Sequence, residues 1–516
     1  MAVKVLLIQP KIHGKPSVPP LGLGYLAATL RQHPGFEVSI IDNEVYSYDD
    51  DQLAEVIKQK NPDILGLTSL VLSRHRSMYV AAKVEAPYIV FGGPQPTLEE
   101  RFYLKKSNYF VVRGEGENVF VNFCLAIRDG KPIEEIRKIR GLAYLDDNSQ
   151  VVKNPPEPYI PNIDSVPFPA YDLFEMDYYT HRLEGGRCTT MMTSRGCPYT
   201  CVYCYHVLNT KFRFRTPANV IAEIRFLEKQ YGITRYKFFD DVFTLNRKHT
   251  VDLMNAFIEE KLDIRWQILT RVNLVDEELL KLMYKAGLRH ISFGIESGSP
   301  NTLKRIDKRV SLEQNIKAIQ FCRKVGIKTK AYIILGFPWE TQQDIELTTQ
   351  FLENVMPDSA QFLFATPYQN TDMEKMVLQE GYHIQEIERL ENEPDLTVST
   401  FDSRHWTREE LMEMYIEAHY RYFAAGGFGK LKVKDTNNVY KRLKPLLIRN
   451  RVKFAFLRYS RPITYINKYR ALLDRVNQVK RLGVQSLWKK YIAEKKNFMH
   501  ERHFAVPTKT TLYSDI

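Results

Sequence analysis

A chain of 516 residues with 44% hydrophobic and 26% charged residues has a globular composition, and its length predicts two or three domains rather than one core. No apolar run is long enough to cross a bilayer, and MAVKVLLIQP leads into an ordinary strand without a signal-peptide pattern, which predicts a cytoplasmic protein, free or peripheral to a membrane. The formal net charge of +12 is uneven, because residues 430–500 contain 20 Lys and Arg against three acids.

Residues 1–150 alternate short apolar runs with helical stretches, which is the pattern of an α/β, doubly wound parallel sheet of the flavodoxin-like kind. Strands are expected at Lys4–Gln9, Glu37–Asp42, Ile64–Ser69, Tyr88–Phe91 and Tyr109–Val112, and helices at Leu23–Arg31, Asp51–Lys60 and Ser77–Val84. In such a sheet, ligands bind at the carboxyl ends of the strands, so the loops there are the informative places.

Those loops read PKIHGKPSVPPLGLGYL, TSLVLS, GGPQPT and RGEGEN. Their glycines let the backbone approach a bulky ligand closely, and loop amides can hold a phosphate. A flavodoxin-like fold that has lost its ligand is the alternative interpretation.

Residues 151–187 are dense in proline, which resists helix and sheet and favours an extended strap across a surface. This stretch is therefore predicted to be a linker between two domains. Its prolines are Pro155, Pro156, Pro158, Pro161, Pro167 and Pro169.

Three cysteines follow in the segment MMTSRGCPYTCVYCYH, at Cys197, Cys201 and Cys204, with the spacing C-x-x-x-C-x-x-C. Three thiolates on one tight loop can hold three irons of a four-iron, four-sulfur cluster and leave the fourth iron open to a substrate. A zinc site would need four ligands, and although His206 is near, the first spacing does not suit a zinc knuckle. Disulfides are disfavoured, since a large chain of ordinary composition points to a reducing cytosol.

Strand and helix alternation restarts at Cys188 and continues to Glu374, which predicts a partial (β/α)6 barrel with its chemistry at the carboxyl ends of the strands. The strands are expected at Thr190–Ser194, Tyr236–Phe239, Arg265–Leu269, His290–Ile295, Thr329–Leu335 and Ala360–Ala365, with helices such as Pro217–Tyr231, Asp276–Ala286 and Leu312–Val325.

Residues 375–425 are predicted to be a helical cap, in which Thr407–Phe423 has a capping threonine followed by acids. Residues 426–516 form a basic helical C-terminal region, where Lys and Arg alternate with aromatic residues and leucines. Amphipathic helices on anionic membranes have this make-up, and each basic group there contributes about 1 kcal/mol. A solvated helical hairpin explains the region equally well, and nucleic-acid binding is less favoured.

The cysteine spacing, with aromatic Tyr203 just before the last cysteine, resembles that of the radical S-adenosylmethionine (SAM) superfamily. The resemblance implies that Tyr203 contacts the adenine of SAM and that polar groups at the predicted strand ends hold the rest of it. An acidic pair would neutralise the ammonium group, although a solvated turn is its alternative reading. The implied SAM-binding residues are Tyr203, Asp240, Asp241, Arg271, Asn273, Glu296, Ser297 and Gly298.

The loops of residues 1–150 resemble the cobalamin-binding domain in front of many radical SAM enzymes, where GGP and GEGE loops surround the cofactor. The implied cobalamin-binding residues are Pro20, Gly22, Ser69, Gly92, Gly93, Gln95, Pro96, Gly114, Glu115, Gly116 and Glu117. The D-x-H-x-x-G motif of methionine synthase and the mutases does not occur, and His13 lacks the required Asp and Gly. No histidine is therefore expected below the cobalt.

Together, roughly the first 425 residues resemble cobalamin-binding radical SAM enzymes of the class B methyltransferase and anaerobic cyclase type. The resemblance implies a four-iron, four-sulfur cluster, SAM and cobalamin as cofactors, and methylation of an unactivated carbon through a 5′-deoxyadenosyl radical. Radical oxidation or ring formation without methyl transfer is the first alternative, and a non-catalytic cobalamin- or redox-sensing protein is the second. Expected partners are a small-molecule or lipid substrate, an electron donor such as flavodoxin or ferredoxin, and an anionic membrane surface for residues 430–500.

Overall fold

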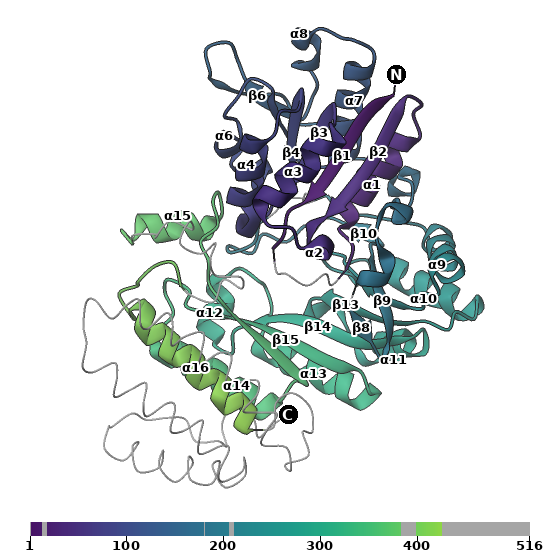
Figure 1. Ribbon diagram of the computed structural model, residues 1–516. Coiled ribbons are helices and arrows are strands. Elements are labelled where there is room, and N and C mark those ends of the chain that lie inside the picture. The colour runs from purple at the N-terminus through teal and green to yellow at the C-terminus, as the bar shows by residue number, and fades with distance from the viewer. Residues whose placement is uncertain (1, 13–17, 180, 206–210, 383–398, 426–516) are drawn as a thin grey trace. The chain divides into compact units, whose positions relative to one another are not determined.

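The structure is a computed structural model that describes residues 2–12, 18–179, 181–205, 211–382 and 399–425 (Figure 1). The basic C-terminal region, residues 383–398 of the cap, and both His13 and His206 lie outside the described residues. The chain divides into two compact units, Met1–Ile345 with Gln361–Glu413 and Glu346–Ala360 with Met414–Ile516. The sites described below lie in the first unit.

A seven-stranded sheet in the order β2-β1-β3-β4-β5-β6-β7 forms the N-terminal part of the first unit (Figure 1). Its first five strands in the chain pair in parallel, and β6 and β7 extend it as an antiparallel edge. The strands are β1 (Val3–Gln9), β2 (Phe36–Asp42), β3 (Ile64–Thr68), β4 (Tyr88–Gly92), β5 (Tyr109–Val112), β6 (Leu142–Leu145) and β7 (Val151–Lys153). The predicted doubly wound sheet is confirmed, and it continues past residue 150, where the linker was expected to begin.

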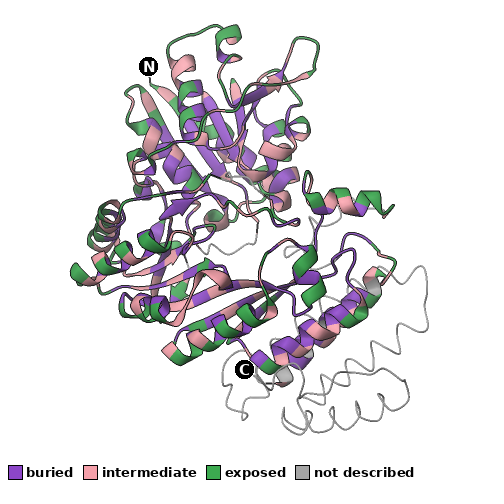
Figure 2. Ribbon diagram, turned by 180° about the vertical axis from the view of Figure 1, so that it is seen from behind, coloured by how far each residue is buried: buried purple, intermediate pink, exposed green. Residues whose placement is uncertain are grey.

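Helices cover both faces of this sheet because successive strand residues alternate between the faces. Leu6 and Ile8 belong to a buried cluster with α3 (Asp50–Lys60) and α4 (Arg74–Lys83). On the other face, Leu7 lies beside Gly66 and Phe120 of α7 (Gly116–Arg128), and α7 packs against α1 (Leu21–Arg31). Figure 2 shows the buried residues gathered on the strands between these helices. Shorter helices are α2 (Asn43–Tyr46), α5 (Pro94–Leu98), α6 (Glu100–Tyr103) and α8 (Ile133–Ile136).

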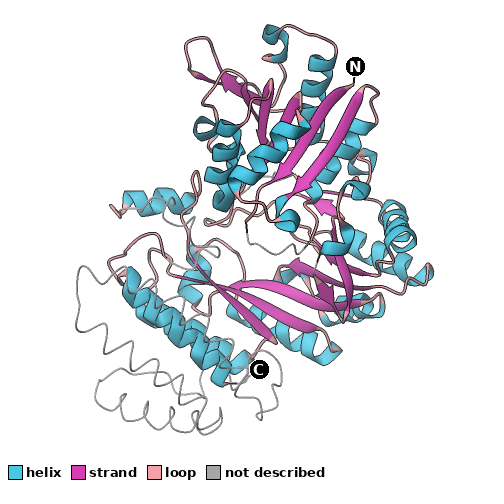
Figure 3. Ribbon diagram, viewed as in Figure 1, coloured by secondary structure: helices cyan, strands magenta, loops and turns pink. Residues whose placement is uncertain are grey.

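A second seven-stranded sheet, in the order β16-β15-β14-β13-β12-β9-β8, is curled (Figure 3). Its strands β9, β12, β13, β14 and β15 are parallel, which confirms the predicted partial barrel. The strands are β8 (Arg182–Leu183), β9 (Gly186–Met191), β12 (Arg235–Phe238), β13 (Arg265–Thr270), β14 (Leu288–Glu296), β15 (Lys328–Leu335) and β16 (Ser359–Phe364). The helices are α9 (Pro217–Tyr231), α10 (Arg247–Glu259), α11 (Glu277–Lys285), α12 (Pro300–Arg305), α13 (Leu312–Val325), α14 (Gln342–Val355), α15 (Asp372–Gln379) and α16 (Arg408–Ala424).

The first barrel strand ends earlier than the predicted Thr190–Ser194. After β9 ends at Met191, β10 (Ser194–Arg195) leaves the sheet and pairs antiparallel with β11 (Arg213–Phe214). The cause is Asp240, whose Oδ1 accepts hydrogen bonds from the Thr193 amide and hydroxyl at 2.9 Å each and from Ser194 Oγ at 2.6 Å. These bonds redirect the chain toward the three cysteines.

The helices in the described ranges include none that is both long and apolar enough to cross a membrane.

Candidate active site

The cluster loop, residues 196–205, follows β10 and carries the three motif cysteines. Cys201 is buried, Cys197 is half-buried and Cys204 is exposed. Both backbone polar groups of Val202 are hydrogen-bonded: its amide donates to the Ile306 carbonyl at 3.2 Å, and its carbonyl accepts from the Met373 amide at 2.9 Å. The loop is therefore fixed between two later segments of the barrel domain.

Electrostatic interactions link the three thiols. Burial raises the pKa of Cys197, and the nearby Asp241 and Cys201 raise it further. Although solvent reaches Cys204, desolvation raises the pKa of its thiol to about 12, and Cys201 and Cys197 add to that rise. Iron must therefore displace protons when it binds here.

Across the described ranges, no group of three or more His, Cys, Asp or Glu side chains is arranged around a single metal ion. This absence of a site for a single ion does not conflict with a four-iron, four-sulfur cluster on the three cysteines. Each cysteine that ligates a four-iron, four-sulfur cluster binds a different iron, so the sulfurs need not converge on one point.

Arg271, directly after β13, lies against the cluster loop. Its guanidinium is buried, lies 3.6 Å from the Cys201 sulfur, and stacks over the Tyr199 ring with 3.6 Å between the guanidinium carbon and the ring centroid. It also donates to the carbonyl of Lys308, and its Nε lies 3.4 Å from Asn273 Oδ1. The structure thus places Arg271 next to Cys201, a predicted iron ligand. The SAM-binding roles of Arg271 and Asn273 stay predictions.

Asp240 and Asp241 perform different local tasks. Asp240 is buried, with its Oδ1 used by Thr193 and Ser194, whereas its Oδ2 has no hydrogen-bond partner among the described protein atoms. Burial raises the pKa of Asp240 to about 6. Asp241 accepts from the Gly196 amide at 2.9 Å, at the start of the cluster loop. The unpartnered Oδ2 of Asp240 suits a ligand ammonium group, because buried polar atoms are normally hydrogen-bonded.

A buried Lys–Glu pair occupies the end of β14. Glu296 has a left-handed backbone, with φ of 64°, and its carboxylate accepts from Lys308 Nζ. Glu296 also hydrogen-bonds Tyr203 and helps to raise the pKa of that phenol, although burial is the larger cause. A Cβ on Gly294 would lie 2.2 Å from Glu296 Oε1 and 2.5 Å from Lys308 Nζ, so a side chain there would displace the pair from its present position.

Lys308 is a site residue that sequence reasoning missed. It lies in the turn after α12, twelve residues beyond Glu296, and no spacing rule connects the two. The same turn supports the cluster loop through Ile306, and through Asp307, whose carboxylate accepts from Thr200 Oγ1 at 3.2 Å.

Glu340 lies in the segment GFPWET, residues 336–341, which resembles a late motif of the radical SAM family, but Glu340 itself was not among the predicted site residues. It is fully buried and accepts from the Gly336 amide at 2.8 Å and the Phe337 amide at 3.2 Å, and Ser297 Oγ lies 3.4 Å away. Tyr203 packs against Phe337 with 5.8 Å between the ring centroids. The predicted adenine contact and the GFPWET segment therefore adjoin. Gly298 is buried beside Ser297.

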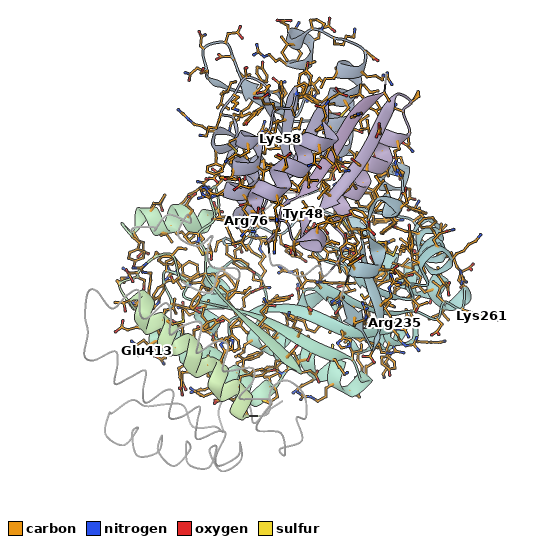
Figure 4. The ribbon with its side chains drawn as sticks, viewed as in Figure 1. Tyr48, Lys58, Arg76, Arg235, Lys261 and Glu413 are labelled. Atoms are coloured by element: carbon orange, nitrogen blue, oxygen red, sulfur yellow. The ribbon has the colours of Figure 1, made fainter. Side chains whose placement is uncertain are left out.

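The ligand edge of the N-terminal sheet is open at three of its predicted cobalamin-binding glycines. A Cβ added at Gly22, Gly92 or Gly114 would meet no atom within 4 Å. The backbone can therefore be approached closely there, as a bulky cofactor requires. Tyr48 and Arg76 lie at the same edge (Figure 4).

Other predicted cobalamin-binding residues are engaged within the protein. Ser69 Oγ lies 2.8 Å from the hydroxyl of Tyr103, and Gln95 donates to Glu99. Gly93 has φ of 97°, and a Cβ there would lie 2.9 Å from Thr68 Oγ1. The remaining residues have structural positions too: Pro20 precedes α1, Pro96 is buried in α5, and Gly116 begins α7, where an added Cβ would lie 3.1 Å from a Leu26 methyl. Their contact with cobalamin stays a prediction.

An ion-pair cluster of Glu115, Glu117, Arg195 and Arg213, all buried, joins the N-terminal sheet domain to the barrel. Glu115 binds Arg213 through both oxygens, at 2.6 and 2.9 Å, and accepts from the Ile160 amide at 3.2 Å. Glu117 pairs with Arg195 at 2.7 Å. The carboxylates of the GEGE segment are thus used to hold Arg195, two residues before Cys197.

The residues present fit the groups that the sequence implies. Three cysteine sulfurs on a bonded loop provide the soft donors of an iron–sulfur cluster. The unpartnered Asp240 Oδ2 and the open glycine edge provide places for a cationic ligand and for a large cofactor.

Comparisons with known proteins agree with this geometry. A family model described as the radical SAM superfamily matches residues 191–352, and one described as the B12 binding domain matches residues 12–123. The chain is 38% identical to an uncharacterized methyltransferase, PH0819, of Pyrococcus horikoshii, over 68% of this chain and 77% of the relative. It is 31% identical to the anaerobic magnesium-protoporphyrin IX monomethyl ester cyclase of Rubrivivax gelatinosus, over 72% of this chain and 69% of the relative.

A solved structure shares the fold. It is the radical SAM methyltransferase TsrM of Kitasatospora setae with cobalamin and a four-iron, four-sulfur cluster bound. Its TM-score is 0.59 at 21% identity, and the match covers 73% of this chain and 78% of that chain.

Proposed function

The chain belongs to the family of cobalamin-binding radical SAM enzymes, and on that premise we propose that it methylates an unactivated carbon of a small molecule. The cofactors are a four-iron, four-sulfur cluster on Cys197, Cys201 and Cys204, and cobalamin at the carboxyl edge of the N-terminal sheet. The 38% identity to a protein named as a methyltransferase supports methyl transfer.

The observation that carries the proposal is that both ends of the cluster loop are bonded to the N-terminal domain. Arg195, two residues before Cys197, pairs with Glu117. Tyr205, directly after Cys204, donates to the carbonyl of Pro94, which follows the β4 glycines. The iron site and the proposed cobalamin edge are therefore held together, as a reaction that uses both requires.

When bound, the two cofactors supply reductive cleavage of SAM to a 5′-deoxyadenosyl radical and a carrier for the methyl group. The protein's own residues bind and orient. Asp240 Oδ2 accepts from the SAM ammonium group, Tyr203 with Phe337 forms an apolar wall for the adenine, and the Glu296–Lys308 pair faces the ribose. Arg271 holds positive charge beside the Cys201 sulfur. When the cluster is bound, an external donor would supply the electron for this cleavage.

Radical oxidation or ring formation is the second candidate, because the chain is also 31% identical to an anaerobic cyclase. The two reactions differ in the products that they form from SAM. Methyl transfer from SAM leaves S-adenosylhomocysteine, and radical formation leaves 5′-deoxyadenosine and methionine. A methyltransferase that uses SAM for both steps forms both products, whereas a cyclase forms 5′-deoxyadenosine without S-adenosylhomocysteine.

The test is anaerobic purification with added cobalamin and cluster reconstitution, followed by iron and cobalt counts and product analysis with SAM and a reductant. About four irons and one cobalt per chain, with both nucleoside products, support the proposal. If the protein contains iron but no cobalt, methyl transfer through cobalamin is contradicted, and the assignment as a radical SAM enzyme still stands. Cobalt without any cleavage of SAM would favour a binding protein.

A further inference from the structure

The inner face of the curled barrel sheet carries polar residues at regular spacing. Along β12 and β13, and in the middle of β14 and β15, every second residue is buried, and Phe238 and Trp266, for example, pack against Phe257 of α10. In these stretches the alternate residues face the other way and are partly buried or exposed. In register across the strands, Lys237 lies beside Gln267, and Gln267 beside His290.

Two lysines on this face share a neighbour. Lys330 Nζ lies 4.7 Å from the centroid of the Tyr332 ring, and Tyr332 also acts electrostatically on Lys237. Strands β13 and β14 separate the lysine-bearing strands β12 and β15, which would place them about 14 Å apart in a flat sheet. The curl of the sheet brings these strands closer on its inner face (Figure 3), and both Tyr332 and Lys330 act electrostatically on Lys237.

Neither lysine has a carboxylate partner in the part of the chain that the structure describes. Lys330 donates to Gln361 Oε1 at 2.6 Å, and Lys237 lies over the Phe239 ring at 4.9 Å. Burial lowers the pKa of both ammonium groups, and Lys330 adds to that effect at Lys237. Two half-buried cations without a counter-charge are costly unless a ligand supplies one.

The rest of the inner face is mixed in character. His181 Nε2 lies 2.7 Å from Gln267 Nε2, and burial with the charge of Lys237 lowers the pKa of His181. The acid Glu184 pairs with His290 at 2.8 Å and approaches Lys328 at 3.7 Å, so it is engaged away from the two lysines. Phe239, directly after β12, and Leu269, in β13, keep 56% and 37% of their residue surface exposed, although both are apolar.

We propose that the inner face of the barrel binds an anionic substituent of the substrate, a phosphate or carboxylate, through Lys237 and Lys330. Phe239 and Leu269 contact the apolar part of the same molecule. This inference rests on the proposed function for the identity of the ligand as substrate, since in barrels of this kind the reaction takes place at the carboxyl ends of these strands. A substrate bound in this way has its anion toward the sheet and its reacting carbon toward Arg271 and the cluster loop.

The experiment uses the full chain loaded with cluster and cobalamin and measures binding by isothermal titration calorimetry. The probes are hexyl phosphate, hexanoate and hexylammonium, which share a chain and differ in the head group. Binding of at least one anion, with no measurable binding of hexylammonium, is expected, and the two anions distinguish a phosphate from a carboxylate. Equal binding of all three probes, or of none, would overturn the proposal.

Variants locate the anion. Lys237→Gln and Lys330→Gln should each weaken binding of the anion about tenfold or more, as loss of a charge-assisted hydrogen bond does. Lys237→Arg keeps the charge and should retain binding, which guards against a loss caused by misfolding. Lys58→Gln, on the outer surface of α3 (Figure 4), is the matched control and should change affinity by less than about twofold. Unchanged affinity in both glutamine variants would contradict the site.

Failure of this site and failure of the proposed function give different results. Wild-type protein that binds the anion but releases no 5′-deoxyadenosine from SAM would contradict the proposed function and leave the anion site standing. If the protein cleaves SAM but binds the three probes equally, the anion site is contradicted and the proposed function still stands.

Discussion

Replacing Glu115 with glutamine tests whether the GEGE carboxylates hold the two domains together. Glu115 neutralises Arg213 through two oxygens and also lies 3.6 Å from Arg195. All three side chains keep 7% or less of their surface exposed. The amide can still accept from Arg213, but it carries no charge, so a buried guanidinium loses its counter-ion.

The expected cost is large because removing one partner of a buried ion pair destabilises by about 3–5 kcal/mol. If the first unit unfolds cooperatively, this lowers its thermal midpoint by roughly 4–6 °C, because the shift per kcal/mol shrinks as the unfolding unit grows. Hydrogen exchange should rise at β10, β11 and the cluster loop, because Arg195 and Arg213 lie on those strands. Differential scanning fluorimetry and hydrogen–deuterium exchange of the full chain measure the two effects.

The matched control is Glu55→Gln, which removes an exposed carboxylate 3.9 Å from Lys58 and should cost at most about 1 kcal/mol. If Glu115→Gln and Glu55→Gln have the same thermal midpoint and the same exchange at β10 and β11, the ion-pair cluster does not join the domains. A double variant, Glu115→Leu with Arg213→Met, should recover part of the loss, since apolar replacement of a buried pair is often neutral.

Three further predictions concern the barrel site. Cys201→Ala should lose the cluster after reconstitution whereas Cys322→Ala, in a fully buried core position, should retain it; equal iron counts in the two would contradict the ligand assignment. Arg271→Met removes a positive charge 3.6 Å from the Cys201 sulfur and should lower the reduction potential of the cluster in a redox titration followed by electron paramagnetic resonance, so an unchanged potential would argue against that contact. Burial raises the pKa of Glu340 from 4.5 to about 7, so its contribution to stability is complete below pH 4.5 and is lost as the pH rises through 7. Glu340→Gln should therefore remove this part of the decline in thermal midpoint between about pH 5 and 7.5, and an identical decline in wild type and variant would refute the shift.

The fold could be predicted closely because local patterns determine it. Periodicity placed the helices Pro217–Tyr231 and Leu312–Val325 at the bounds that the structure has, where Thr216 and Ser311 cap the amino termini and glycines follow the carboxyl termini. The early end of β9 was not predictable, since it depends on Asp240, which lies almost fifty residues later.

Where the candidate residues lie in one short segment, the sequence alone is enough to propose the site. The three cysteines and the acidic pair fall at recognisable spacings and at the ends of strands. Lys308 was missed because no spacing rule connects it with Glu296, twelve residues earlier, and the contact of Glu340 with Ser297 joins two segments that lie far apart in the sequence. The GEGE carboxylates were recognised as a motif, but their pairing with Arg195 and Arg213 could be seen only in the structure.

The most direct measurement is the quantity of 5′-deoxyadenosine released from SAM by the reconstituted full-length protein under reducing, anaerobic conditions. We expect release by the wild type and none by Cys201→Ala, with S-adenosylhomocysteine formed alongside when cobalamin is present. No 5′-deoxyadenosine from wild-type protein that carries a complete cluster would contradict the assignment as a radical SAM enzyme.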